Sequence, residues 1–303
     1  MKLKTKDVLT LAELSPKEFS GLIDSSINLK SELKKNKTKP VLKNKTLTMI
    51  FQKPSTRTRV SFEIGMLQLG GHAINLSSND TQLSRGESIE DTAKTLSRYS
   101  DCIMARVYEH HLLEKLSKYA SVPVINGLSD SFHPCQILAD FMTIKEKKKK
   151  LKGIKIAWVG DGNNVCNSMI YGAALSGIDM SIATPKGFEP EKTVVNESRK
   201  KINVELTPDP YVATKNADVV VTDTYSSIHN DDPKRIKKFL PKYQVNSKLM
   251  NNAKKNAIFM HCLPAKRDQE VTSSVIDGSQ SVVWDEAENR LHAQKALLAA
   301  IIS

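Results

Sequence analysis

The stretch LTMIFQKPSTRTRVSFEIGMLQLGG, residues 47–71, carries the pattern that decides the fold. Its opening residues are apolar or β-branched, which predicts a buried strand over Leu47–Phe51. A helix is expected over Arg57–Leu69, because the pair Gly70-Gly71 ends the run of helix-forming residues. A strand that leads directly into a helix is the repeating unit of a parallel α/β sheet.

The alternation of short apolar segments with longer helical stretches continues along the chain. Further strands are expected over His72–Leu76, Cys102–Ala105, Val122–Ile125, Ile154–Val159, Asp179–Thr184, Val219–Thr222, Ala257–Met260 and Val282–Trp284. Further helices are expected over Pro134–Lys148, Asn164–Ser176 and about Ala287–Ile302. The sequence therefore predicts an α/β protein built on parallel sheets.

The Lys-rich segment KEKKKKLK, which ends just before Gly153, is the expected domain junction. We expect two domains, residues 1–148 and 149–303, each a parallel sheet flanked by helices. The C-terminal helix is expected to pack back on the first domain. Ligands of open parallel sheets bind beyond the carboxyl ends of the strands, so the active site is expected in the cleft between the domains.

Composition limits the classes of function. The 303 residues include 45 Lys and Arg against 33 Asp and Glu, a net charge of +12, which suits an anionic partner. The few aromatic residues are not interleaved with the Lys-rich runs, as a base-stacking surface requires. No apolar run approaches the roughly 18 residues of a membrane span, and the first residues do not resemble a signal peptide. Four cysteines without CxxC spacing indicate free thiols, so we expect a cytoplasmic protein that binds neither nucleic acid nor membrane.

The segment Ser55-Thr56-Arg57-Thr58-Arg59 lies where the first strand runs into its helix. Three hydroxyls, two guanidinium groups and the free N–H groups of a helix start are the donors that a phosphate needs. The alternative is a Ser or Thr helix cap followed by surface arginines. We favour an anion site, because the two arginines and three hydroxyls are grouped at the end of a strand.

Three further polar residues are expected at the same edge of the first sheet. Arg106 ends the third strand, and His133 and Gln136 follow the fourth. Arg106 and His133 together could polarise a carbonyl oxygen, and Gln136 could hold an amide. Cys135 is expected to serve packing.

The loop Gly160-Asp161-Gly162-Asn163-Asn164-Val165 begins like a dinucleotide fingerprint. Val165 stands where the third glycine is required, and no acidic residue follows at the end of the next strand. These departures argue against the alternative of a nicotinamide-dependent dehydrogenase. The two asparagine amides suit a small polar substrate instead.

Further candidates end the later strands. Asp223 follows VVVT, with Ser227 four residues on, and its carboxylate suits a cationic amine as well as a helix cap. His261-Cys262 follows AIFM, but the pair lacks further ligands at fixed spacing, so no metal site is expected. The segment DEAENR contains acids that suit a helix start and Arg290, which could face the site.

Taken together, these motifs resemble the aspartate/ornithine transcarbamoylases over essentially the whole chain. STRTR at residues 55–59 and HPCQ at 133–136 are similar to the family's carbamoyl phosphate motifs. GDGNN at 160–164, the Asp223 segment, HCLP at 261–264 and DEAENR at 285–290 are similar to its ornithine branch. Cys262 favours that branch, since the aspartate branch carries Pro at this position.

The resemblance implies carbamoyl transfer from carbamoyl phosphate to the δ-amine of ornithine, giving citrulline and phosphate without a cofactor. It implies catalytic roles for Arg106, His133 and Cys262. The carbamoyl phosphate site would consist of Ser55, Thr56, Arg57, Thr58, Gln82, Arg106, His133, Gln136, Cys262, Leu263 and Arg290. Gln82 would reach into a neighbouring subunit, which requires a homo-oligomer, in this family typically a trimer or a multiple of trimers. Ornithine would contact Asn164, Asp223, Ser227 and Ile228, and the Leu263-Pro264 peptide would be cis.

One segment departs from the family pattern. The ornithine branch usually carries Ser-Met-Gly where this chain has Ser227-Ile228-His229. Isoleucine is stiffer than methionine, and histidine gives up glycine's free access to positive φ. A related amine, such as acetylornithine or putrescine, therefore remains an alternative substrate, and the direction of arginine metabolism stays open.

Overall fold

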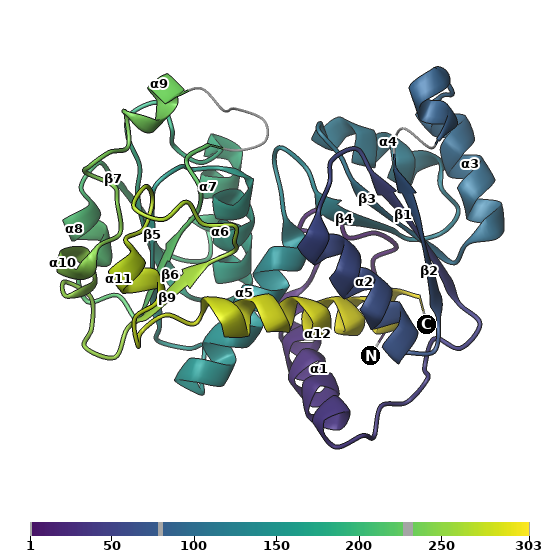
Figure 1. Cartoon of the computed structure of the whole chain (residues 1–303), viewed down its shortest axis with the longest axis horizontal. Coiled ribbons are helices and arrows are strands. Elements are labelled where there is room, and N and C mark those ends of the chain that lie inside the picture. The colour runs from purple at the N-terminus through teal and green to yellow at the C-terminus, as the bar shows by residue number, and fades with distance from the viewer. Residues whose placement is uncertain (1, 78–80, 227–232, 303) are drawn as a thin grey trace. The chain divides into compact units, whose positions relative to one another are not determined.

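The computed structural model describes residues 2–77, 81–226 and 233–302 (Figure 1). The chain divides into two compact units. The first comprises Met1–Met142 and Glu288–Ser303, and the second comprises Thr143–Ala287. The C-terminal segment thus belongs to the first unit, although it follows the second in the chain.

The first unit contains a four-stranded parallel sheet in the order β2-β1-β3-β4. Its elements are α1 (Pro16–Lys34), β1 (Thr46–Phe51), α2 (Thr56–Gln68), β2 (His72–Ser77), a 3-10 helix (Gln82–Arg85), α3 (Ile89–Tyr99), β3 (Cys102–Arg106), α4 (His110–Tyr119), β4 (Val124–Leu128) and the start of α5 (Pro134–Lys148). Helices α3 and α4 pack together beside β3 and β4, and α2 packs beside β2 (Figure 1). Apolar side chains of β1, β3, α3 and α4 form a buried cluster between these layers.

The second unit contains a five-stranded parallel sheet in the order β7-β6-β5-β8-β9. Its elements are β5 (Lys155–Val159), α6 (Asn164–Ser176), β6 (Asp179–Ala183), α7 (Lys192–Ser198), β7 (Val204–Thr207), α8 (Pro210–Thr214), β8 (Val219–Thr222), α9 (Pro233–Ile236), α10 (Ser247–Met250), β9 (Ile258–His261), α11 (Ser273–Ile276) and the start of α12 (Val283–Ile301). Phe239 stacks on Tyr225 in its core, with ring centroids 4.4 Å apart. The prediction of parallel sheets flanked by helices is confirmed for both units.

Two details of the predicted secondary structure are wrong. Val282–Trp284 is not a strand, because only Ser281 forms an isolated bridge to Phe259 and α12 already begins at Val283. The apolar VVW pattern suits a buried strand and a buried helix start equally well, and the backbone pairing decides for the helix. Strand β7 was not predicted, since two of its four residues, Glu205 and Leu206, are exposed at the sheet edge.

Strand register determines which loops meet at the carboxyl edges of the sheets. In the first unit Phe51 pairs with Arg106, so the segment after β1 leaves the sheet beside Arg106. In the second unit Thr222 pairs with His261, so Asp223 and Cys262 follow on neighbouring strands. Each group of predicted residues is therefore brought to one edge of its own sheet. Within the described residues, no helix has the length and apolar character needed to cross a membrane.

Candidate active site

The segment Ser55–Arg59 forms the start of α2, directly after β1. Ser55 is the helix N-cap, and its Oγ accepts the N–H of Thr58 at 3.3 Å. The capping alternative is therefore part of the structure, and it also holds the first turn of α2 with its N–H groups at the strand end. Arg59 turns outward and pairs with Glu63 on the helix surface at 2.9 Å.

Two guanidinium groups from distant parts of the chain converge on Thr58. The Thr58 side chain is buried, and its Oγ1 accepts from Arg106 Nη1 at 3.5 Å and from Arg290 Nη2 at 3.3 Å. Arg106 comes from the end of β3 and Arg290 from α12, and both are more than 90% buried. Buried arginines that share one hydroxyl partner make a strongly cationic site, which suits a phosphate.

His133 lies just before α5 and is 4% exposed. Burial lowers the pKa of its imidazole well below the usual range, and the positive charges of Arg290, Arg106 and Arg57 lower it further. The ring is therefore neutral at physiological pH. A neutral imidazole beside three arginines can donate one hydrogen bond to an oxygen without adding charge. The structure thus brings together the histidine and the arginines that the sequence predicted.

Gln136 lies in the first turn of α5 and is completely surrounded by protein. Its Oε1 accepts from Arg290 Nη1 at 2.6 Å, and its Nε2 donates to Asp140 Oδ1 at 2.7 Å. The sequence predicted Gln136 as a site residue that holds an amide. In the structure its carbonyl oxygen holds Arg290, and Asp140, which the sequence analysis did not single out, holds its amide nitrogen.

Lys53 is a second residue that sequence analysis missed. It is 1% exposed, and its Nζ lies 3.9 Å from the centroid of the Tyr108 ring. Burial and, to a smaller extent, the charge of Arg106 lower the pKa of Lys53 to about 8, against the opposing effect of Asp130. The backbone N–H of Tyr108 donates to Gln52 Oε1 at 2.8 Å, so the segments after β1 and β3 are bound to each other. The only sign in the sequence that Lys53 belongs to the candidate site is its position two residues before the STRTR motif.

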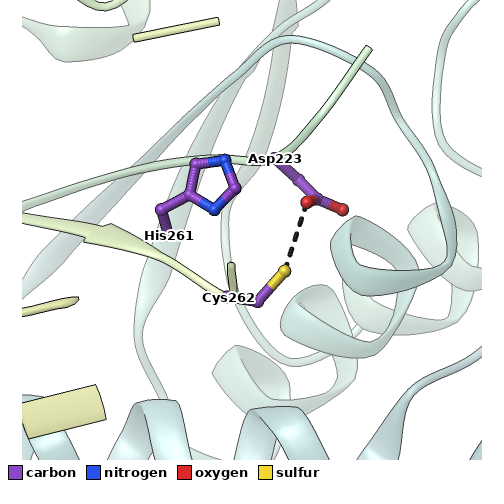
Figure 2. A group of neighbouring side chains, drawn as sticks. All are labelled: Asp223, His261 and Cys262. Atoms are coloured by element: carbon purple, nitrogen blue, oxygen red, sulfur yellow. Dashed lines mark hydrogen bonds between the residues drawn. The ribbon is translucent and has the colours of Figure 1, made fainter. Parts of the chain in front are cut away.

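In the second unit, Asp223 and Cys262 are in contact (Figure 2). The thiol lies 3.1 Å from Asp223 Oδ1, and Asn163 Nδ2 donates to Asp223 Oδ2 at 2.7 Å. Asp223 is buried, whereas Cys262 is partly exposed. The carboxylate is thus held in place by the side chains of two loops, which leaves it suited to bind an ammonium group.

His261 organises the loop that carries Cys262. Its backbone N–H donates to Glu286 Oε2 at 3.0 Å, and its Nδ1 accepts the N–H of Leu263 at 2.9 Å. Since Nδ1 accepts, Nε2 carries the proton and faces Glu270 Oε1 at 3.1 Å. Leu263 has a φ of 56°, which is unusual for a residue other than glycine, and the Leu263-Pro264 peptide is cis as expected.

Asp223, His261 and Cys262 also bring one potential metal-ligand atom each to within 4.8 Å of the others. The sequence did not predict this third partner for the His-Cys pair. Both ring nitrogens of His261 are already bonded, one to Leu263 and the other to Glu270. A metal ion would have to break one of these buried bonds, so the trio is better explained by hydrogen bonding.

The glycine-rich loop after β5 packs against protein. A Cβ on Gly162 would lie 2.3 Å from the backbone nitrogen of Pro190, and the Gly162 N–H donates to Phe188 at 2.8 Å. Asp161 pairs with Arg235, and burial raises the pKa of its carboxyl to about 6. These contacts give both Gly162 and Asp161 a role in the packing of the fold. They further weaken the alternative that this loop binds a dinucleotide.

The remaining predicted site residues have fewer described contacts. Asn164 begins α6, and its side chain accepts the N–H of Val165 at 3.0 Å. Gln82 is exposed in its 3-10 helix, and its backbone oxygen accepts the N–H of Glu87 at 3.1 Å. Ser227 and Ile228 lie outside the described residues.

Comparison with known proteins agrees with these motifs. Residues 6–146 match the model "Aspartate/ornithine carbamoyltransferase, carbamoyl-P binding domain", and residues 152–301 match "Aspartate/ornithine carbamoyltransferase, Asp/Orn binding domain". The ornithine carbamoyltransferase of Cenarchaeum symbiosum is 62% identical over 301 residues, 99% of each chain, and that of Bacillus subtilis is 52% identical over 306 residues, 98% of this chain and 94% of the relative.

Solved structures give the same result. The ornithine carbamoyltransferase from Pyrococcus furiosus superposes with a TM-score of 0.96 at 50% identity, covering 100% of this chain and 98% of that one. The enzyme from Thermus thermophilus gives 0.91 at 39% identity and 99% coverage of both. The chain belongs to the aspartate/ornithine carbamoyltransferase family.

Proposed function

We propose that this protein is an ornithine carbamoyltransferase, which transfers the carbamoyl group of carbamoyl phosphate to the δ-amine of L-ornithine. The observation that carries the proposal is the convergence of Arg106 and Arg290 on Thr58 beside a neutral His133. A dianionic phosphate needs several fixed cations, and an attacked carbonyl needs donors directed at its oxygen. The resemblance of the chain to named ornithine carbamoyltransferases supplies the reaction.

The carbamoyl phosphate site of the proposal lies mainly in the first unit. The phosphate would be bound by the start of α2, through Ser55, Thr56, Arg57 and Thr58. Arg106 and His133 would donate to the carbonyl oxygen. Arg290, held by Gln136, would add a further positive charge to the site. The family further implies the main chain of Cys262 and Leu263, and Gln82 from a neighbouring subunit.

The ornithine site of the proposal lies in the second unit. Asp223, held by Asn163 and Cys262, would bind the α-ammonium group, and Asn164 would contact the same amino acid. Ser227 and Ile228 complete the set by family analogy. An alkylamine with a pKa of about 10.4 is mostly protonated at neutral pH, so the site must select the neutral form of the δ-amine.

The proposed reaction is direct attack. The δ-nitrogen forms a bond to the carbonyl carbon, and the C–O bond to phosphate breaks. Negative charge that develops on the carbonyl oxygen is stabilised by Arg106 and by the neutral imidazole of His133. The departing phosphate accepts the proton released by the amine, so neither an acyl-enzyme nor a cofactor is required.

We also propose a homo-oligomer built from trimers. Val60, Ile64 and Leu67 repeat along one face of α2, and all are exposed, Leu67 to 66%. Ile74 is also exposed, on the edge strand β2 that α2 packs beside. A cluster of exposed apolar side chains on an edge strand and its neighbouring helix is typical of a subunit interface. The four cysteines are free thiols, which supports a reducing cytoplasmic location.

The proposal is tested by citrulline formation from carbamoyl phosphate with a panel of amines. Ornithine is the expected substrate. Acetylornithine and putrescine are included because Ser227-Ile228-His229 departs from the family pattern. Activity with one of these amines and none with ornithine would assign the protein to a related transcarbamoylase. The absence of a carbamoylated product with every amine would overturn the function itself.

A further inference from the structure

Asp140 lies one helical turn after Gln136 on the same face of α5, and both side chains are 1% exposed. The two are joined by the hydrogen bond from Gln136 Nε2 to Asp140 Oδ1, at 2.7 Å. Neither the sequence motifs nor the family resemblance singled out Asp140. Its buried carboxylate therefore needs an explanation, because burying a carboxylate is unfavourable unless its partners compensate.

The orientation of the Gln136 amide is determined from both ends. Arginine has only donors, so the atom of Gln136 that lies 2.6 Å from Arg290 Nη1 must be the carbonyl oxygen. The amide nitrogen then faces Asp140, and an ionised carboxylate has only acceptors. Turning the amide over would place donors against donors at Arg290 and acceptors against acceptors at Asp140. Asp140 thus allows only one orientation.

This orientation extends to the proposed phosphate site. The Gln136 oxygen holds one terminal nitrogen of Arg290, and the other terminal nitrogen donates to Thr58 at 3.3 Å. Thr58 belongs to the first turn of α2 and also accepts from Arg106. The series Asp140, Gln136, Arg290 and Thr58 therefore connects a carboxylate to the guanidinium groups of the site. Each link is a buried hydrogen bond within the first unit.

We propose that Asp140 is a positioning residue for carbamoyl phosphate: it holds Gln136 with its carbonyl oxygen toward Arg290 and so fixes the Arg290 guanidinium for the substrate. The inference rests on the proposed function and deepens it, since it explains how that site is kept in order. It also gives Gln136 a role in holding Arg290. A preorganised donor is worth more than a mobile one, because no reorganisation is needed when charge develops.

The first test compares Asp140→Ala and Asp140→Asn with wild type in steady-state kinetics. Asp140→Ala removes the acceptor, so the KM for carbamoyl phosphate is expected to rise about tenfold or more. The KM for ornithine is expected to change far less. Asp140→Asn keeps an oxygen that can accept from Gln136, so its effect is expected to be smaller. A merely structural role predicts no such separation between the two substrates.

The second test exchanges the amide of Gln136 and the carboxylate of Asp140. Gln136→Glu alone places two carboxylates against each other beside Arg290, and it is expected to be the worse variant. Gln136→Glu with Asp140→Asn restores a donor facing an acceptor and leaves an oxygen toward Arg290. The double variant is expected to recover affinity for carbamoyl phosphate relative to Gln136→Glu. No recovery would overturn the positioning role, and this result decides the matter even if Asp140→Ala does not fold.

Asp101→Ala serves as the matched control. Asp101 bonds Lys45 and the backbone of Thr46, before the start of β3 and so at the opposite end of that strand from Arg106. Its loss is expected to lower thermal stability with little change in either KM. Wild-type citrulline formation with an unchanged KM in Asp140→Ala would reject the inference and leave the proposed function intact. A wild type that makes no citrulline and does not bind carbamoyl phosphate in calorimetry would reject both.

Discussion

Arg290 Nη1 donates to Gln136 Oε1 over 2.6 Å, although the two residues lie 154 positions apart in the chain. The contact joins the C-terminal helix α12 to the HPCQ motif at the start of α5. It makes the end of the chain part of the same site as the segment after β1, because Arg290 also donates to Thr58. Loss of the terminal helix would therefore remove a guanidinium group proposed to bind carbamoyl phosphate, as well as packing.

Replacement of a site arginine should be far more harmful than replacement of its surface neighbour. Arg106→Ala removes a buried donor proposed to act on the carbonyl oxygen, and turnover is expected to fall by about 10² to 10³. Arg57→Ala is expected to act in the same way. Arg59→Ala breaks only the exposed pair with Glu63 and should leave turnover near wild type. Initial rates of citrulline formation measure all three, and equal rates for Arg106→Ala and Arg59→Ala would contradict the site.

Cys262→Ser should separate the two substrates. The thiol contacts Asp223, so its replacement is expected to raise the KM for ornithine while binding of carbamoyl phosphate is largely kept. Kinetics with each substrate varied in turn measure this difference. Mass spectrometry of the wild type during turnover provides the counter-test. A carbamoylated thiol found there would replace direct attack by an acyl-enzyme mechanism.

Lys53 should make stability depend on pH above neutrality. Burial lowers the pKa of Lys53 in the folded protein to about 8 from an ordinary value of 10.5. Between these values the unfolded chain holds a proton that the folded protein has lost, so this residue's contribution to stability increases with pH. Relative to Lys53→Met, the wild type is expected to gain up to about 2 kcal/mol in unfolding free energy between about pH 7 and pH 9.5.

Urea denaturation at the two pH values measures this gain, and parallel stabilities of wild type and Lys53→Met would contradict it. The same deprotonation removes a positive charge beside Arg106. Binding of carbamoyl phosphate by the wild type is therefore expected to weaken as the pH rises through about 8. In Lys53→Met this part of the pH dependence should be missing.

The exposed apolar face of α2 should control the oligomeric state. Val60→Glu places a charge on this face, where the wild-type side chain is 50% exposed, and it is expected to reduce the particle to a smaller species. Val212→Glu on α8 is the matched control, because Val212 is also an exposed valine, 42% exposed, and belongs to the second unit. Sedimentation velocity gives the masses. Identical masses for wild type and Val60→Glu would remove α2 from the interface.

Local patterns were sufficient for most of the fold. The predicted helices Pro134–Lys148 and Asn164–Ser176 are confirmed residue for residue, because Pro134 and the cap Asn163 begin them and Gly177 ends the second in the left-handed region. Strand β7 escaped prediction because exposed edge residues obscure its apolar pattern. Val282–Trp284 was misassigned because three apolar residues fit either state until their backbone partners are known.

The residues of the candidate site were likewise predicted only in part from the sequence. STRTR and HPCQ could be recognised as site motifs from the sequence, because each is a short run of polar residues that follows a predicted strand. Lys53 and Asp140 could not be recognised in this way. A lysine two residues before a motif and an aspartate on a helix look like surface residues until their burial is known. Their environment comes from segments distant in the chain, such as Tyr108 for Lys53.

The sequence by itself determined the α/β class, the order of most strands and the motif residues that follow the strand ends, because periodicity, caps and turns are local properties. Only the tertiary structure decided that Arg290 holds Gln136, that Cys262 contacts Asp223 and that His133 is neutral. These features depend on strand register and on burial. Register sets which loops meet, and burial sets which charges a side chain can keep, and both arise only when segments far apart in the chain pack together.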